Sequence, residues 1–168
     1  MLFGFLSGRC SSSGCSSLTQ EKEVKMIHGV DIIKKYEGFR ADAYKCPAGV
    51  WTIGFGSTQY ADGTPVKKGD KISEDTAEGL LIDYLNKNVR PHIEELGLTA
   101  DTQIAAVESL VYNIGWSAFS KSKCCKAIKE KDWETVFNNW NWVKGDGKFL
   151  LGLAKRRAEE LNLFFKDL

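Results

Sequence analysis

Three side chains that can take part in hydrolysis, Glu37, Cys46 and Thr52, lie within the sixteen residues 37–52. A carboxyl group can donate a proton to a leaving oxygen, and a thiolate or hydroxyl can hold, deprotonate or replace an attacking water. Singly, each residue has an ordinary structural explanation: a glutamate before a glycine can simply end a helix, and a cysteine is commonly a small core residue. Their proximity in the chain makes a hydrolytic site the stronger interpretation.

The glutamate is predicted to stand at the end of a helix. Apolar residues recur at helical spacing from Val24 to Tyr36, and Gly38 suits a left-handed C-terminal cap. The negative end of the helix dipole disfavours a carboxylate. Glu37 is therefore well placed to keep the proton that a general acid donates.

The thiol and the hydroxyl are predicted to lie on a β-hairpin. Residues 43–45 and 50–53 indicate two short strands, and residues 46–49 have proline second and glycine fourth, as in a type I turn. Because side chains alternate along a strand, Thr52, Gly54 and Gly56 share one face. That face is nearly bare backbone, against which a flat polymer can lie.

The stretch from Glu37 to Gly56 resembles the phage-type lysozymes, the endolysin muramidase family. The matching residues are Glu37-Gly38 and then Tyr44-Lys45-Cys46-Pro47-Ala48-Gly49-Val50-Trp51-Thr52-Ile53-Gly54-Phe55-Gly56. Two later blocks also resemble the family, Tyr112-Asn113-Ile114-Gly115 and Gly152–Glu159. The resemblance covers about residues 26–165, most of the chain.

This resemblance implies an α+β, mostly α, lysozyme-like fold, in which a small lobe with a β-hairpin is joined by a long helix to a helical lobe. It implies an endolysin that hydrolyses the β-1,4 bond between N-acetylmuramic acid and N-acetylglucosamine in peptidoglycan, without a cofactor. Glu37 would be the general acid. Cys46, at a position where aspartate is commoner, would act as base, nucleophile or water holder, helped by Thr52.

The implied mechanism makes two further predictions about the catalytic pair. An inverting enzyme would hold its two catalytic groups roughly 6.5–9.5 Å apart. A free thiol has a pKa of about 8.5, so Cys46 would be mostly neutral at pH 7 unless Lys45 or Arg40 lowers its pKa.

Five other residues are candidate substrate contacts. Asn113 ends a predicted helix and could bind sugar, although a helix end without a ligand is an equal explanation. Trp142 lies off the apolar stripe around it and could stack on sugar, but a place in the core is the commoner role for such a tryptophan. The resemblance implies an arginine near Glu37 and leaves open whether it is Arg156 or Arg157. The candidates are Tyr44, Gly54, Asn113, Trp142 and Arg157.

The rest of the chain is predicted to form helical scaffold. Ser73 and Thr99 are expected to cap two helices. The first of these has an apolar face made of Leu80, Leu81, Tyr84, Leu85 and Val89, and the last helix is expected at about Leu153–Phe165.

Composition excludes several other classes of protein. The 168 residues suffice for one domain, and a net charge of +1 favours no nucleic-acid partner. Five cysteines cannot form a complete disulfide framework, and no CxxC pair or phosphate-binding loop is present, so we expect neither a metal site nor a cofactor. We expect a monomer whose partner is the glycan strand of peptidoglycan.

Residues 1–23 are predicted to be a flexible Ser/Gly-rich extension preceding the lysozyme-like domain 24–168. Their apolar start is too short for a membrane span or a convincing export signal, so we expect no stable membrane insertion. The protein would then be made in the host cytoplasm and reach the periplasm through a lesion made by a separate membrane-permeabilising protein. Cys10 and Cys15 suggest a disulfide with Cys46 that would hold the enzyme inactive until it is reduced.

Three rival functions remain open from the residues alone. A cysteine peptidase would use Cys46 with His28 or His92 to cut peptide bonds. A lytic transglycosylase would use a lone glutamate and leave 1,6-anhydro ends. A non-catalytic wall-binding module would need only the bare strand face and the basic stretch 121–157.

Overall fold

The structure, a computed structural model, describes residues 27–168. The predicted extension 1–23, with Cys10 and Cys15, therefore lies outside the described residues. The elements in chain order are α2 (Ile27–Glu37), β1 (Arg40–Lys45), β2 (Trp51–Gly54), α3 (Glu74–Asn88), α4 (Arg90–Glu94), α5 (Asp101–Ile114), α6 (Trp116–Ser120), α7 (Lys123–Glu130), α8 (Trp133–Asn139), β3 (Lys144–Gly145), β4 (Lys148–Phe149) and α9 (Leu151–Phe164).

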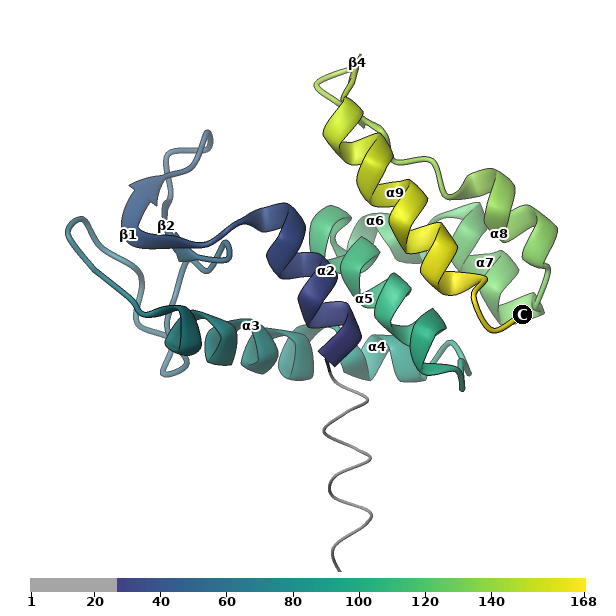
Figure 1. Cartoon of the computed structure of the whole chain (residues 1–168), viewed down its shortest axis with the longest axis horizontal. Helices are drawn as coiled ribbons and strands as arrows, with labels where there is room; N and C mark the ends of the chain where they lie inside the picture. Colours follow the sequence, from purple (N-terminus) through teal and green to yellow (C-terminus); the bar gives the residue numbers. More distant parts are fainter. Residues whose placement is uncertain (1–26) are drawn as a thin grey trace, which may run out of the picture.

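These elements form the two lobes that the sequence predicted. The β1–β2 hairpin and the loops after it make the small lobe, and α3 runs from that lobe into the helical one (Figure 1). In the helical lobe, α5 packs against both α2 and α9. The α+β, mostly helical fold class is confirmed.

The predicted helix starts agree with the structure at one cap and differ at another. Ser73 caps α3, and its hydroxyl oxygen accepts a hydrogen bond from the Thr76 amide at 3.2 Å. The prediction for Thr99 is wrong, because α5 begins one residue later and Ala100 occupies its N-cap without a side-chain hydrogen bond. The last helix, α9, also begins two residues before the predicted Leu153.

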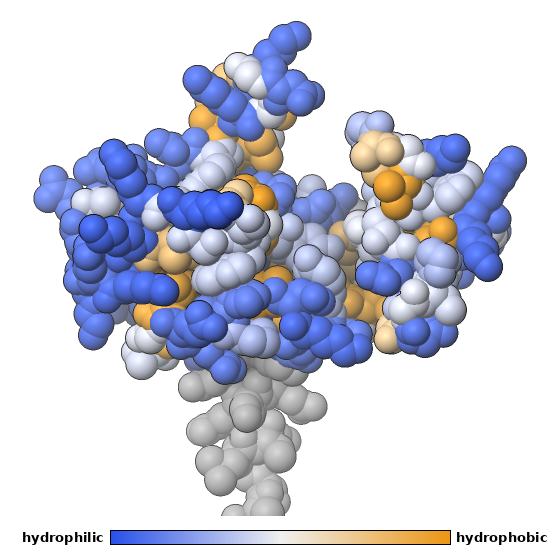
Figure 2. Space-filling model, turned by 180° about the vertical axis from the view of Figure 1, so that it is seen from behind, coloured by the Kyte–Doolittle hydropathy of each residue, from blue (hydrophilic) through white to orange (hydrophobic). Residues whose placement is uncertain are grey.

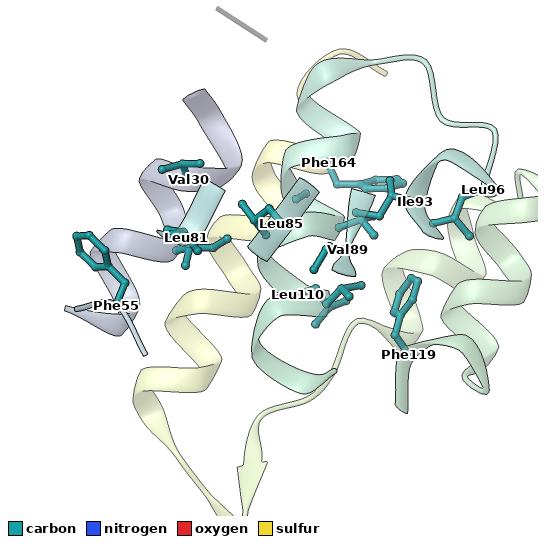
Figure 3. Close-up of a cluster of buried hydrophobic side chains, with 14 of the residues drawn as sticks. Val30, Phe55, Leu81, Leu85, Val89, Ile93, Leu96, Leu110, Phe119 and Phe164 are labelled. Atoms are coloured by element: carbon teal, nitrogen blue, oxygen red, sulfur yellow. The ribbon is translucent and has the colours of Figure 1, made fainter. Parts of the chain in front are cut away.

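The apolar core extends through both lobes and is crossed by α3. Figure 3 shows labelled core side chains from Phe55, which follows β2, past Leu81 and Leu85 of α3 to Phe119 of α6. Leu81 is 1% exposed and Leu85 is fully buried. The long helix is therefore part of the core as well as the link between the lobes.

Truncation of this core at its centre should destabilise the whole domain. We expect Leu85→Ala to cost about 2–5 kcal/mol of unfolding free energy, because it removes buried methyl groups and leaves a cavity. Leu168→Ala is the control, since Leu168 is 64% exposed and its truncation should change stability little. Urea denaturation of the two variants measures the difference. Equal midpoints would contradict a continuous core through α3.

Candidate active site

A cavity of about 580 Å³ lies where the two lobes meet. Figure 2 shows the surface hollowed between the small lobe, on the right in that view, and the helical lobe. The cavity is lined by the end of α2, the loop after β2, one face of α3 and the end of α5. Its lining residues include Glu37, Gly56, Tyr60, Asp83, Tyr84, Lys87, Asn88, Tyr112 and Asn113.

Glu37 is the last residue of α2, as predicted, and its side chain is 27% exposed in this cavity. Gly38 adopts a left-handed φ of 71°, and its amide donates to the Lys34 carbonyl at 3.1 Å. The helix therefore stops at Glu37, and the chain turns towards the hairpin. This cap leaves the carboxyl group at the point where the lobes meet.

Arg156 of α9, not Arg157, is the arginine that contacts Glu37. Its Nη1 lies 2.7 Å from Glu37 Oε1. The guanidinium is itself held in place, because Nε donates to Glu160 Oε1 at 3.2 Å and Nη2 donates to the Ser109 carbonyl at 3.0 Å. At 3% side-chain exposure, Arg156 is a buried clamp on the Glu37 carboxyl group.

Arg157 lies behind the cavity wall instead of in the cavity. Its side chain is 2% exposed, its Nη2 donates to Asn113 Oδ1 at 3.2 Å, and burial lowers its pKa to about 10. Its Nη1 has no hydrogen-bond partner among the described residues, and its Nε lies 2.8 Å from Glu160 Oε2 without hydrogen-bond geometry. Its contacts are with protein, so this placement gives no support to the prediction that Arg157 binds substrate.

Glu160 joins both arginines and was missed from the sequence. It is fully buried and accepts hydrogen bonds from Ser109 at 2.6 Å and from the Trp140 indole at 3.1 Å. Burial raises its pKa, while Arg157, Ser109 and Arg156 act in the opposite direction. The spacing was a usable signal, because residues three and four apart on a helix share a face.

Cys46 lies in the turn between β1 and β2, as predicted. The Gly49 amide donates to the Cys46 carbonyl at 2.8 Å, which closes the turn. The pKa of the thiol is lowered from its ordinary value, chiefly by the Val50 backbone amide, with further hydrogen bonds from the Ala48 amide and the Thr52 hydroxyl. The turn itself therefore favours the thiolate.

The charged neighbours that the sequence suggested as activators of Cys46 have other contacts. The Arg40 guanidinium lies over the Tyr44 ring at 4.5 Å, and the Lys45 ammonium lies over the Trp51 ring at 5.6 Å. Neither side chain is among the main causes of the lowered pKa of Cys46. The sequence named these cations as groups that could lower the pKa of the thiol, whereas the main lowering causes are hydrogen bonds of the turn.

Thr52 lies beside Cys46 but is largely buried, at 4% exposure. Its hydroxyl is 3.2 Å from the Val50 carbonyl and also within hydrogen-bonding reach of the Cys46 sulfur. A hydroxyl has one hydrogen, so it donates to one of these acceptors at a time. Tyr44 pairs with Thr52 across the hairpin. Cys46, Thr52 and Tyr44 lie on the hairpin, outside the lining of the cavity.

Gly54 does not present a bare face to a polymer. It is buried with φ of 64°, and a Cβ there would lie 2.8 Å from the Cβ of Ala77 on α3. β2 ends at Gly54, and residues 55 and 56 lie in the turn that follows, so the predicted strand face running from Thr52 to Gly56 is wrong; α3 covers Gly54 itself. The glycine is thus required for close packing of β2 against α3, and this packing gives no support to its predicted contact with substrate.

Trp142 also belongs to the protein interior more than to the cavity. It is partly buried against the core, its ring lies 6.4 Å from the ring of Phe119, and it is outside the cavity lining.

Tyr84, which the sequence placed on an apolar face, is instead 48% exposed in the cavity. Its ring meets the ring of Tyr112 edge-on at 5.5 Å.

The structure gives Cys46 no described histidine partner. His92 lies on α4 in the helical lobe, away from the hairpin (Figure 1), and stacks on Trp116 at 4.6 Å. The His28 side chain lies outside what the structure describes.

Among residues 29–168, no group of three or more His, Cys, Asp and Glu side chains is placed to hold a metal ion. No helix in the described part of the chain is long and apolar enough to cross a membrane.

Comparisons of the sequence and of the structure with known proteins both find phage lysozymes and related muramidases. Residues 34–160 match the phage lysozyme family model. The chain is 36% identical over 150 residues to an endolysin of Acyrthosiphon pisum secondary endosymbiont phage 1, covering 81% of this chain and 94% of that protein. A crystal structure of a P22 lysozyme mutant superposes with a TM-score of 0.72 at 32% identity, covering 82% and 95% of the two chains. The muramidase domain of SpmX from Asticaccaulis excentricus gives a TM-score of 0.65 at 28% identity, covering 83% of this chain and 95% of that chain.

Proposed function

Since this chain belongs to the phage lysozyme family and is an endolysin of the glycoside hydrolase class, we propose that Glu37 is its general acid. The substrate is peptidoglycan, and the bond is the β-1,4 link between N-acetylmuramic acid and N-acetylglucosamine. The observation that carries the proposal is the Glu37 carboxyl group, exposed in the cavity and clamped by a buried arginine. Asp83, which also lines the cavity, is instead paired with Lys87 at 2.7 Å.

In the proposed reaction, Glu37 gives its proton to the glycosidic oxygen as the bond from that oxygen to the sugar C1 breaks. A water attacks C1 from the opposite face, and its proton passes to the Cys46 thiolate, so one water is consumed and two hydroxyl ends form. The hydrogen bonds of the turn favour the thiolate that this step requires. The separation of 6.5–9.5 Å expected for inversion stays a prediction.

The test of this function is a parallel assay of the groups released from purified peptidoglycan. A muramidase releases reducing sugar ends and no new amino groups. The cysteine-peptidase alternative predicts the reverse, and a binding module releases neither. Amino groups without reducing ends would overturn the proposal.

The predicted disulfide of Cys46 with Cys10 or Cys15 extends this proposal to regulation. Cys46 is partly exposed, so a second thiol can approach it, and a disulfide would remove the proposed base. We expect oxidised protein to gain activity when a reductant is added, and the Cys10→Ser/Cys15→Ser double variant to be active without one. Equal activity of oxidised wild type with and without reductant, with all five thiols free by mass, would refute this prediction.

The route to the wall is also a proposal. The enzyme acts on the cell wall, and we propose that it is made as a monomer in the host cytoplasm and crosses the membrane through a lesion made by another protein. Expression in a bacterial host with and without a membrane-permeabilising agent tests this route. Prompt lysis without the agent would contradict it.

A further inference from the structure

Asn113 lines the same cavity as Glu37, and its amide has a defined orientation. It lies in the last turn of α5, is exposed, and lines the cavity with Glu37. Arg157 Nη2 lies 3.2 Å from Asn113 Oδ1. A guanidinium has only donors, so the group that faces it must be the amide oxygen and not the NH₂ group.

Arg157 cannot move aside to let this amide turn over. It is 2% exposed, the same Nη2 donates to Glu160 Oε1 at 3.0 Å, and Nε lies 2.8 Å from the other carboxylate oxygen. Turning the amide over would place its NH₂ group against the guanidinium, donor to donor, in a partly buried site. The Asn113 Nδ2 therefore points away from Arg157, and it donates to no other described residue.

A fixed donor in the cavity that holds Glu37 selects an acceptor on the ligand. Sugar hydroxyls can donate or accept, whereas an amide carbonyl only accepts. Peptidoglycan offers such a carbonyl on the acetamido group of each sugar and on the lactyl group of the muramic acid. Both sources present the same oxygen acceptor.

Building on the proposed function, we propose that the Asn113 NH₂ group binds an amide carbonyl of the sugar next to the scissile bond, with Arg157 and Glu160 as its positioning residues. Asn113 is then a determinant of specificity for acylated glycan. Loss of one such hydrogen bond should weaken binding roughly 3- to 10-fold.

Two substitutions isolate the donor. Asn113→Leu is neutral, of similar size and unable to donate. Asn113→Asp keeps an acceptor for Arg157 but also lacks the NH₂ group. Because Asn113 is exposed, both variants should fold, which thermal denaturation verifies. Binding is measured by co-sedimentation with peptidoglycan sacculi in the Glu37→Gln background, so that turnover does not interfere.

The same sacculi after chemical N-deacetylation identify the carbonyl. We expect both substitutions to weaken binding to native sacculi. If the partner is the acetamido group, Asn113→Leu has no further effect on deacetylated sacculi; if it is the lactyl carbonyl, the effect persists there. The inference would be overturned if both variants bound native sacculi as tightly as the Glu37→Gln parent does. A Glu37→Gln parent that still releases reducing ends would count against the proposed function instead.

Discussion

Glu37→Gln should lower kcat/KM on peptidoglycan by about 10²–10⁴-fold, the usual contribution of a general acid. The amide is isosteric, and its oxygen can still accept from Arg156 Nη1, which lies 2.7 Å from Glu37 Oε1. The side chain therefore keeps its place in the cavity while the donated proton is lost. Reducing-end release under initial-rate conditions measures the effect.

Glu159→Gln is the matched control for this substitution. Glu159 is also a glutamate beside a cation, since Lys35 Nζ lies 2.6 Å from its carboxylate, but it is outside the cavity lining. An exposed ion pair contributes about 0–1 kcal/mol, so we expect activity close to that of the wild type. If Glu37→Gln were as active as Glu159→Gln, Glu37 would be only the end of a helix.

Cys46→Ser should be the second most damaging change, with a loss of about 10²–10³-fold at neutral pH. A serine hydroxyl preserves the size of the group but does not ionise near pH 7, so it cannot take the proton of the attacking water as a thiolate does. Assays in reductant exclude disulfide effects. Full activity of Cys46→Ser would show that the thiol only holds the attacking water and does not act as its base.

The dependence of activity on pH tests the same role of Cys46, and the direction of that dependence can be predicted. The turn lowers the pKa of Cys46 from its ordinary value, so activity should rise with pH as the thiolate forms, from a lower pH than an ordinary thiol would give. Cys46→Asp should recover activity relative to Cys46→Ser, with the acidic limb shifted to still lower pH, because a carboxyl group ordinarily ionises near pH 4. An unshifted acidic limb in Cys46→Asp would assign that limb to another group.

The sequence was sufficient where a local rule decides the structure. Glu37 before Gly38, the turn at residues 46–49 and the cap at Ser73 each follow from backbone preferences of a few neighbouring residues, and each is present in the structure. The fold class followed from these elements and the resemblance together. The chemistry of Glu37 and Cys46 stays a prediction until it is measured.

The sequence was insufficient where packing decides between neighbours. Arg156 and Arg157 are adjacent, both pair with Glu160, and only the packing of α9 against α5 directs one towards Glu37 and the other towards Asn113. Gly54 shows the same limit, because its place in a strand pattern does not reveal that β2 ends there or that Ala77 packs against it.

Cys46 shows a different limit, since sequence reasoning looked for activating charges. Its largest influence is the Val50 backbone amide, and the direction of an amide depends on how the turn closes. No residue type encodes that direction alone.

The sequence did not predict the exposure of Tyr84, because a tyrosine on an apolar stripe can be buried or can line a solvent-filled cavity with one face of its ring.

The most direct measurement of the central claim is the identity of the new reducing end. Peptidoglycan digested by the wild-type enzyme is reduced with borohydride, hydrolysed and analysed for sugar alcohols, with the Glu37→Gln variant in parallel. We predict new muramitol from the wild type and very little from the variant. Glucosaminitol, 1,6-anhydromuramic acid ends, or equal muramitol from both proteins would contradict a Glu37-dependent muramidase.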